Sequence, residues 1–170
     1  LSEQSNAAKE IEKKNIHLVI GHNSSGVAKL FLKSFSCGYK ISYVTPLATS
    51  LELKALNEGV FVNWPNNELQ IDAIVRFLKS KLIKSPKIAM IVNESESYST
   101  EMAKLFEEKV KAMSAKEISK ISYLGDKFEP DQIADQFTRL KPDVVFAPIY
   151  SYDLMTLYNS FLSKSASRPI

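Results

Sequence analysis

The chain has 170 residues, 45% of them hydrophobic, and a formal net charge of +3. This composition supports a buried core, excludes a disordered chain and allows one domain or two small lobes. Basic residues are scattered among acidic ones, which argues against a nucleic-acid partner. The single Cys37 excludes an internal disulfide and a multi-cysteine zinc site, and we expect it to be a small core residue within a helix. No run reaches the ~20 apolar residues of a membrane span.

Strands and helices are expected to alternate along the chain. In chain order, the patterns predict a helix ending at 7–14, a strand at 16–20, a helix at 25–37, strands at 41–44 and 60–62, a helix at 68–83, a strand at 87–92, a helix at 98–113, a strand within 118–124, a helix at 130–140, a strand at 143–147, a helix at 151–162 and the start of a strand at 168–170. Leu69, Ala73 and Phe77 are expected to share the buried face of the 68–83 helix.

The fold class that follows is α/β, with parallel sheets flanked by helices. Strand sequences such as "IAMIV" and "VVFA" are apolar throughout, which is typical of parallel strands covered on both faces. Ligands of such sheets bind at the carboxyl ends of the strands. The candidate segments are therefore the four that follow strands, namely "GHNSSG", "TPLATS", "NESESY" and "PIYSYD".

The first two candidate segments are rich in hydroxyl groups. In "GHNSSG", Ser24 or Ser25 can cap the following helix, and the free N–H groups there favour a carboxylate. In "TPLATS", Thr49 offers a hydroxyl and an N–H, and Leu47 offers a carbonyl that no sheet partner needs. A plain helix cap and an ordinary strand-end turn remain open as alternatives for the two segments.

The last two segments carry aromatic residues. Tyr98 and Tyr150 follow strands and could cover an organic ligand, or could simply be amphipathic residues at the surface. No Ser/His/Asp set, Cys/His pair, metal-ligand cluster, phosphate-loop lysine or GxGxxG motif is present. Glu94 and Glu96 lack the defined partner that a general acid–base pair needs. We therefore expect no catalytic residue, no metal and no cofactor.

Five segments together resemble the type I periplasmic binding proteins of the leucine/isoleucine/valine-binding family, which supply solutes to ABC transporters. They are "VIGHNSSGVA", "ISYVTPLATS", "VFVNWPNNELQ", "KIAMIVNESESYSTEMAKLFEEKV" and "DVVFAPIYSYDLMTLY". The resemblance implies a fragment with a partial first lobe at 1–64 and a second lobe at 65–170 that is incomplete at its end. The chain departs from the family in being shorter, in lacking the acidic residue that holds the ligand ammonium, and in carrying Ser99 after the second-lobe tyrosine.

The resemblance also implies the site. Ser25 and Thr49 would meet a ligand carboxylate, the Leu47 carbonyl would face the ammonium group, and Tyr98 and Tyr150 would close over the ligand, all facing one cleft. The expected function is capture of a small amino-acid-like ligand in the periplasm or elsewhere outside the cytoplasm, with a membrane permease or receptor as partner. The alternatives are the sensor domain of a membrane receptor, such as a histidine kinase, and an α/β enzyme acting on phosphorylated substrates.

Two further expectations concern the state of the chain. Because it begins with Leu1, we expect a mature form or an excised fragment. If first-lobe strands are missing, the sheet edge beside residues 16–20 is open, and an open edge favours pairing with another chain. The isolated fragment is therefore expected to bind its ligand poorly or to associate with other copies.

Overall fold

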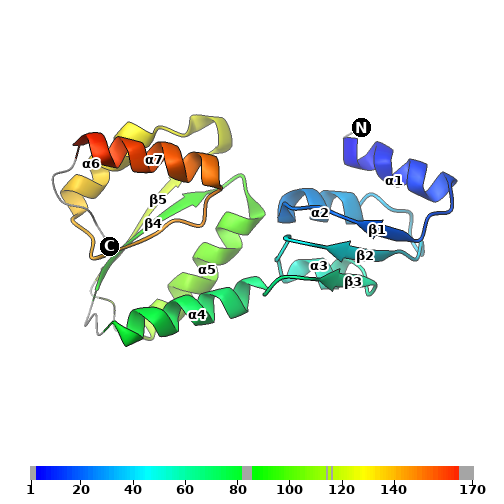
Figure 1. Ribbon diagram of the computed structural model, residues 1–170, viewed down its shortest axis with the longest axis horizontal. Helices are drawn as coiled ribbons and strands as arrows, with labels where there is room; N and C mark the ends of the chain where they lie inside the picture. The colour runs from blue at the N-terminus through cyan, green and yellow to red at the C-terminus, as the bar shows by residue number, and fades with distance from the viewer. Residues whose placement is uncertain (1–2, 82–85, 114, 116, 165–170) are drawn as a thin grey trace. The chain divides into compact units, whose positions relative to one another are not determined.

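The computed structural model describes residues 3–81, 86–113, 115 and 117–164. The chain divides into two compact units, Leu1–Gln70 and Ile71–Ile170, and each contains a three-stranded parallel sheet in its described residues (Figure 1). The predicted α/β fold with parallel sheets flanked by helices is therefore confirmed. The assignment of lobes to 1–64 and 65–170 stays a prediction. None of the described helices is long and apolar enough to cross a membrane.

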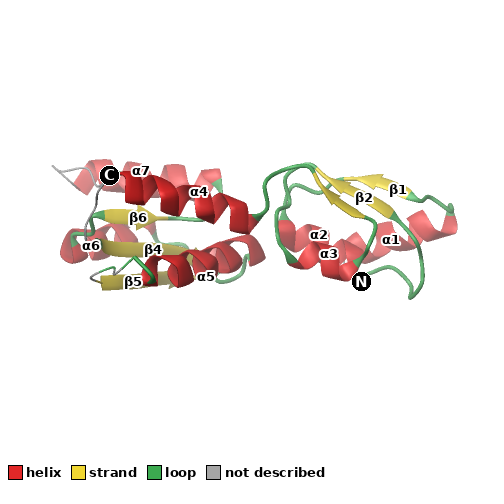
Figure 2. Cartoon of the chain, turned by 90° about the horizontal axis from the view of Figure 1, so that it is seen from below, coloured by secondary structure: helices red, strands yellow, loops and turns green. Residues whose placement is uncertain are grey.

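The first unit has its helices on one face of its sheet (Figure 2). Its elements are α1 Glu3–Lys13, β1 Leu18–Ile20, α2 Ser25–Leu32, β2 Ser42–Thr45, α3 Glu52–Leu56 and β3 Val60–Val62. The strands lie in the order β1-β2-β3. Phe31 of α2, Tyr43 of β2 and Leu53 of α3 are almost fully buried and form the centre of the core between helices and sheet.

The second unit has helices on both faces of its sheet. Its elements are α4 Asn67–Ser80, whose first residues belong to the first unit, β4 Lys87–Asn93, α5 Ser97–Lys111, β5 Glu117–Tyr123, the short 3₁₀ helix η1 Gly125–Lys127, α6 Pro130–Leu140, β6 Val144–Phe146 and α7 Ser151–Lys164. The strand order is β5-β4-β6. Met90 packs with α4 and α5, whereas Ile91 packs with α6 and α7, because successive side chains of a strand point to opposite faces. This two-sided burial explains why "IAMIV" has no polar residue.

The helix predicted at 25–37 ends at Leu32, so its predicted end is wrong. The Ser36 N–H donates to Glu12 Oε1 at 2.5 Å, and the Ser36 hydroxyl donates to Glu12 Oε2 at 2.9 Å. These bonds to α1 compete with a continued helical ladder. Cys37 lies in the irregular segment that follows and is exposed, so the prediction that it is a core residue within a helix is also wrong.

The predicted buried face of α4 is wrong as well. Ile71, Val75 and Leu78 enter the core, whereas Leu69 and Phe77 are more than half exposed. Both sets have helical spacing, so periodicity alone could not choose between them. The strand predicted at 168–170 and the last residues of the helix predicted at 68–83 lie outside the described residues.

Candidate functional site

The carboxyl ends of β1 and β2 bring Ser25 and Thr49 together, although they are 24 residues apart in sequence. The Ser25 Oγ accepts the N–H of Thr49 at 3.2 Å and the N–H of Ser50 at 3.3 Å. Ser25 and Thr49 are each only 2% exposed. The helix cap is the neighbouring Ser24, whose Oγ accepts the Val27 N–H at 3.4 Å. Ser25 therefore does not cap the helix. Its hydroxyl proton has no acceptor among the described residues.

Thr49 has a partner that the sequence did not reveal. Its hydroxyl donates to Asn67 Oδ1 at 2.5 Å, and the Asn67 N–H donates to the Thr49 carbonyl at 3.1 Å. Thr49 does not cap α3, because this helix begins after Leu51, which makes no side-chain cap bond. Asn67 is fully buried, and its Nδ2 finds no hydrogen-bond partner among the described residues. A buried amide donor therefore lies directly beside the predicted carboxylate site.

A second hydrogen-bond network holds the loop after β1 against β2. The Tyr43 hydroxyl accepts the His22 N–H at 2.6 Å and lies 2.9 Å from His22 Nδ1. The Thr45 hydroxyl donates to the His22 carbonyl at 2.9 Å and accepts the Ala48 N–H at 2.9 Å. Burial lowers the pKa of His22, so its ring is neutral near pH 7. The loop after β1, at the carboxyl end of the first sheet, therefore carries no positive charge from His22 near pH 7.

Tyr43 provides a test of this network at high pH. Burial raises the pKa of its phenol to about 12, against about 10 in an unfolded chain. Between these pH values the unfolded state loses a proton that the folded state keeps. The contribution of Tyr43 to the free energy of unfolding is therefore fully present below pH 10, and it falls by up to ~1.4 kcal/mol per pH unit as the pH rises. Denaturant unfolding across this range should show the fall, and Tyr43→Phe should remove this component. An identical slope in the variant would contradict the assignment.

The Leu47 carbonyl is available for a ligand. Leu47 lies in the turn after β2 and is half exposed, and its carbonyl has no hydrogen-bond partner among the described residues. Such a carbonyl can accept a hydrogen bond from an ammonium group. The structure therefore leaves Leu47 in the state that its predicted role requires, and the role itself stays a prediction.

In the second unit, Tyr98 and Tyr150 come together at the carboxyl end of the sheet. Their rings stack with centroids 6.1 Å apart and an interplanar angle of 17°. The Tyr150 hydroxyl lies 3.4 Å from Glu96 Oε2. Burial, and to a smaller extent the neighbouring Tyr150, raises the pKa of Tyr98. The two tyrosines thus form one aromatic surface, and the prediction that they share a cleft with Ser25 and Thr49 stays a prediction.

Sequence reasoning missed a second phenol–carboxylate pair at this end of the sheet. The Tyr123 hydroxyl donates to Asp153 Oδ2 at 2.7 Å. Burial, followed by the bond to Asp153, raises the pKa of Tyr123. The pair joins residues 30 positions apart, and the parallel pairing of β5 and of β6 with β4 brings the end of β5 near the start of α7, which follows β6. With Glu96, this end of the second unit carries two carboxylates beside three phenols.

A small hollow lies beside the Thr49–Asn67 pair in the first unit. Its volume is about 220 Å³, and its lining is Ser50, Leu51, Lys54, Val62, Trp64, Pro65, Asn66 and Leu69. The walls are mainly apolar, with Lys54 as the single charged residue among them. A hollow with mainly apolar walls suits an apolar group better than a highly charged one.

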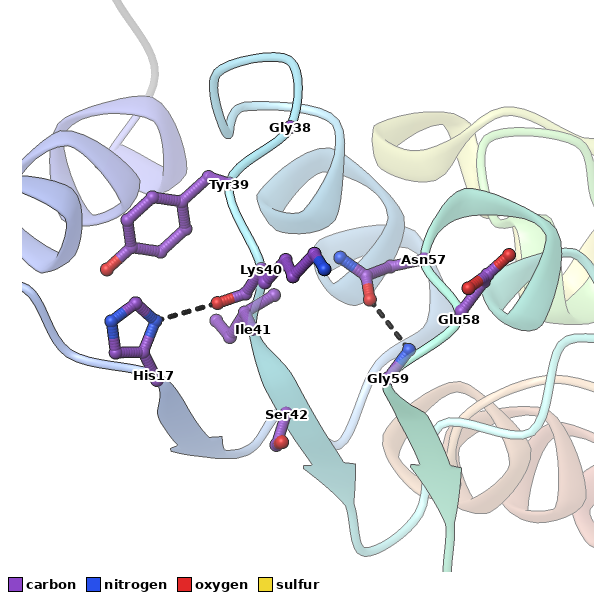
Figure 3. A pocket seen from close by; sticks show the side chains of 9 residues that line it. All are labelled: His17, Gly38, Tyr39, Lys40, Ile41, Ser42, Asn57, Glu58 and Gly59. Carbon is purple, nitrogen blue, oxygen red and sulfur yellow. Dashed lines mark hydrogen bonds between the residues drawn. The ribbon is translucent and has the colours of Figure 1, made fainter.

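A wider hollow of about 670 Å³ lies at the opposite, amino end of the same sheet (Figure 3). His17 Nδ1 lies 2.8 Å from the Lys40 carbonyl oxygen, and Asn57 Oδ1 accepts the Gly59 N–H at 2.8 Å. A Cβ on Gly59 would lie 2.2 Å from the Ile41 carbonyl oxygen, so only glycine fits where the chain enters β3. These groups are occupied in joining the strand starts, and ligands of parallel sheets bind at the other end.

Among the described residues, no three His, Cys, Asp or Glu side chains form a group that could hold a metal ion. The polar groups gathered at the carboxyl ends of the strands are hydroxyls and amides in the first unit, and phenols and two carboxylates in the second. They can bind and orient a small molecule by hydrogen bonds. They do not form a nucleophile with an adjacent base.

Solved structures similar to this chain are solute-binding proteins of ABC transporters, whereas no protein-family model and no curated protein matches the sequence. The leucine-binding protein LivK from Thermotoga maritima has a TM-score of 0.82 at 15% identity, over 97% of this chain and 47% of that chain. The branched-chain amino acid binding protein LivJ from Streptococcus pneumoniae, in complex with isoleucine, has a TM-score of 0.79 at 18% identity, over 99% and 48%. A solute-binding protein from R. palustris, in complex with benzoate, has a TM-score of 0.74 at 21% identity, over 95% and 44%.

These similarities establish the fold, and their coverage establishes its extent. Each similar structure is matched over nearly the whole of this chain but over less than half of its own length. The resemblance seen in the sequence motifs is thereby confirmed at the level of the fold. The chain has the fold of the type I periplasmic binding proteins, as found in the branched-chain amino acid receptors of ABC transporters, and spans about half of it.

Proposed function

We propose that the chain is part of an extracytoplasmic solute-binding protein that reversibly captures a small carboxylate-bearing ligand, an amino acid or a relative, for an ABC transporter. The observation that carries this proposal is the meeting of Ser25 and Thr49 at the ends of two neighbouring parallel strands. The partner is a membrane permease, which reads whether the receptor is loaded. No covalent step is part of the function.

The chemistry of the site favours a carboxylate. Within the described part of the chain, neither the Ser25 hydroxyl proton nor Asn67 Nδ2 has an acceptor, and α2 begins at Ser25 with its positive dipole end. These donors and the dipole favour an anionic oxygen. Isoleucine and benzoate, the ligands named for two of the similar structures, share a carboxylate but not an ammonium group. The carboxylate is therefore the feature that we assign first.

The remaining predicted contacts give the ligand its other groups. The Leu47 carbonyl would accept from an ammonium group, and the stacked rings of Tyr98 and Tyr150 would cover apolar parts of the ligand. Aromatic stacking of this kind does not need a particular side chain on the ligand. A receptor of this type therefore discriminates through its polar groups.

Calorimetric titration of the complete protein with matched ligand pairs tests the proposal. Leucine, isoleucine and benzoate should bind, whereas leucinamide and benzamide, which lack the carboxylate, should not. Thr49→Ala should weaken binding about 10- to 150-fold, because the hydroxyl, on turning from Asn67 Oδ1 to the ligand carboxylate, makes one hydrogen bond to a charged group worth about 1.5–3 kcal/mol. Thr49→Ser, which keeps the hydroxyl, should bind nearly as the parent chain does.

The melting temperature of each Thr49 variant distinguishes a role of Thr49 in ligand binding from a role in stabilising the fold. Loss of the bond to Asn67 should lower the melting temperature of Thr49→Ala in any case. Unchanged affinity together with a lowered melting temperature would remove Thr49 from the site. Equal affinity for leucine and leucinamide would refute the carboxylate assignment as a whole.

A further inference from the structure

The hydrogen bonds between Thr49 and Asn67 lie in the interior of the first unit. Asn67 is the first residue of α4, and both residues are buried. The Thr49 hydroxyl donates to Asn67 Oδ1 at 2.5 Å, and the Asn67 N–H donates to the Thr49 carbonyl at 3.1 Å. The second bond joins backbone groups, so it holds the two residues together whichever way the Asn67 amide group is turned.

The side chain of Asn67 also carries a buried donor without a partner. Its Nδ2 is enclosed by the protein, and none of the described residues accepts a hydrogen bond from it. Buried N–H groups without a partner are rare in folded proteins, and each one calls for an explanation. Because the nitrogen is closed off from solvent, its lack of a partner is a property of the interior and not of an exposed surface.

A half-turn of the Asn67 amide group would give this donor a partner. The carbonyl oxygen and the amino group of an amide have nearly the same shape, so such a turn exchanges their positions. Nδ2 would then lie next to the Thr49 hydroxyl oxygen, which can accept a hydrogen bond. The Thr49 hydroxyl proton would need a new acceptor, and the described part of the chain offers it only Asn67 Oδ1.

We infer that the carboxylate of a bound ligand is this new acceptor, and that Asn67 positions the Thr49 hydroxyl toward it. The inference rests on the proposed function. In the arrangement seen here the hydroxyl donates to Asn67 Oδ1. When a carboxylate binds, the hydroxyl turns to it, the Asn67 amide turns over, and Nδ2 donates to Thr49 Oγ1. Hydrogen bonds in series polarise and strengthen one another, so Asn67 acts on the ligand through Thr49 without touching it.

This exchange of hydrogen bonds requires a side chain that can both accept and donate. Asparagine has both groups, whereas an ionised aspartate of the same shape can only accept. Asn67→Asp would therefore keep the Thr49 hydroxyl turned inward, and it would place a negative charge directly behind that hydroxyl. A like charge repels an anionic ligand. The neutral amide of Asn67 thus determines that this site takes a carboxylate.

Calorimetric titration of the complete protein with leucine tests this role. Asn67→Asp should weaken binding at least about 100-fold, because like charges brought together in a binding site are strongly unfavourable. Asn66→Asp is the matched control, since it adds the same charge one residue earlier and keeps the oxygen that accepts the Leu69 N–H. Its affinity should stay within about fivefold of the parent protein, because a partly exposed charge contributes little. Equal affinities of the two variants would overturn the inference.

Nuclear magnetic resonance of the Asn67 side chain is the direct test, and it decides the matter if Asn67→Asp does not fold by circular dichroism. With isotope-labelled asparagine, one Asn67 amide proton should move downfield at saturating leucine, because Nδ2 gains an acceptor. The signals of Asn57, whose Oδ1 accepts the Gly59 N–H at the other end of the sheet, should not move. Thr49→Val removes the accepting hydroxyl and should abolish the Asn67 shift.

Two results of this measurement would overturn the inference. One is leucine binding that leaves the Asn67 amide signals in place. The other is an equal Asn67 shift in Thr49→Val, because the shift would then not pass through the Thr49 hydroxyl. A parent protein that binds no carboxylate at all is distinguishable from both results, since it would refute the proposed function and the inference together.

Discussion

Replacing Ser25 by alanine is expected to lower the free energy of unfolding of the first unit by about 2–4 kcal/mol. The substitution removes the Ser25 oxygen that accepts the buried N–H groups of Thr49 and Ser50, and the loss of such an acceptor costs about 1–3 kcal/mol for each bond. Two such bonds would together cost about 2–6 kcal/mol. We expect the lower half of this range because both bonds are long, at 3.2 and 3.3 Å. Urea unfolding followed by circular dichroism measures the effect.

Ser24→Ala is the matched control for this experiment. Ser24 precedes Ser25 and caps the same helix, so its loss should cost about 1 kcal/mol. A clearly larger loss for Ser25 identifies it as the residue that joins the two strand ends. Equal losses of stability in the two variants would mean that Ser25 contributes no more than a helix cap does. Ser25 would then not be the residue that holds the two strand ends together at the ligand site.

Replacing Phe106 by alanine is expected to destabilise the second unit by about 3–5 kcal/mol. Phe106 is fully buried, and its ring stacks on Phe146 with centroids 4.0 Å apart. Its removal leaves a cavity between α5 and the sheet, and buried Phe-to-Ala changes cost about this amount. Thermal and denaturant unfolding of the chain should both show the loss.

Phe77→Ala controls for the loss of an aromatic ring as such. Phe77 is more than half exposed on α4, where Lys81 Nζ lies 5.3 Å from its ring centroid. Losing this exposed cation–π contact should cost less than about 1 kcal/mol. A cost for Phe77 that matches the cost for Phe106 would mean that the core face of α4 is the one predicted from sequence, made of Leu69, Ala73 and Phe77.

The strands were predictable because burial on both faces of a sheet requires apolar residues at successive positions of the strand itself. The run "IAMIV" is buried on both faces, so every position has to be apolar, and a continuous apolar run can be read without knowledge of its neighbours. The meeting of Ser25 with Thr49 was predictable for a related reason. In a parallel sheet the carboxyl ends of adjacent strands share one edge, so residues that follow them lie close together.

The partners of these residues were not predictable, because they depend on packing between segments. Ser36 leaves its predicted helix for a bond to Glu12, 24 residues earlier. The Thr49 hydroxyl donates to Asn67, which lies 18 residues later in the sequence and is the first residue of α4. Asn67 follows Pro65 and Asn66 in a stretch that reads as an ordinary helix start. Neither bond has a local pattern, so neither could be found before the segments were placed.

The absence of Asp, Glu, Lys and Arg between Asn15 and Ala28 determines how β1 responds to solution conditions. Ionic screening weakens contacts between charged groups, such as the Lys120–Glu94 pair at the edge of β5. It has nothing to act on along β1, where the contacts are backbone hydrogen bonds and apolar side chains. Added sodium chloride should therefore leave the pairing of β1 with β2 unchanged, whereas urea, which solvates peptide and apolar groups alike, should weaken it.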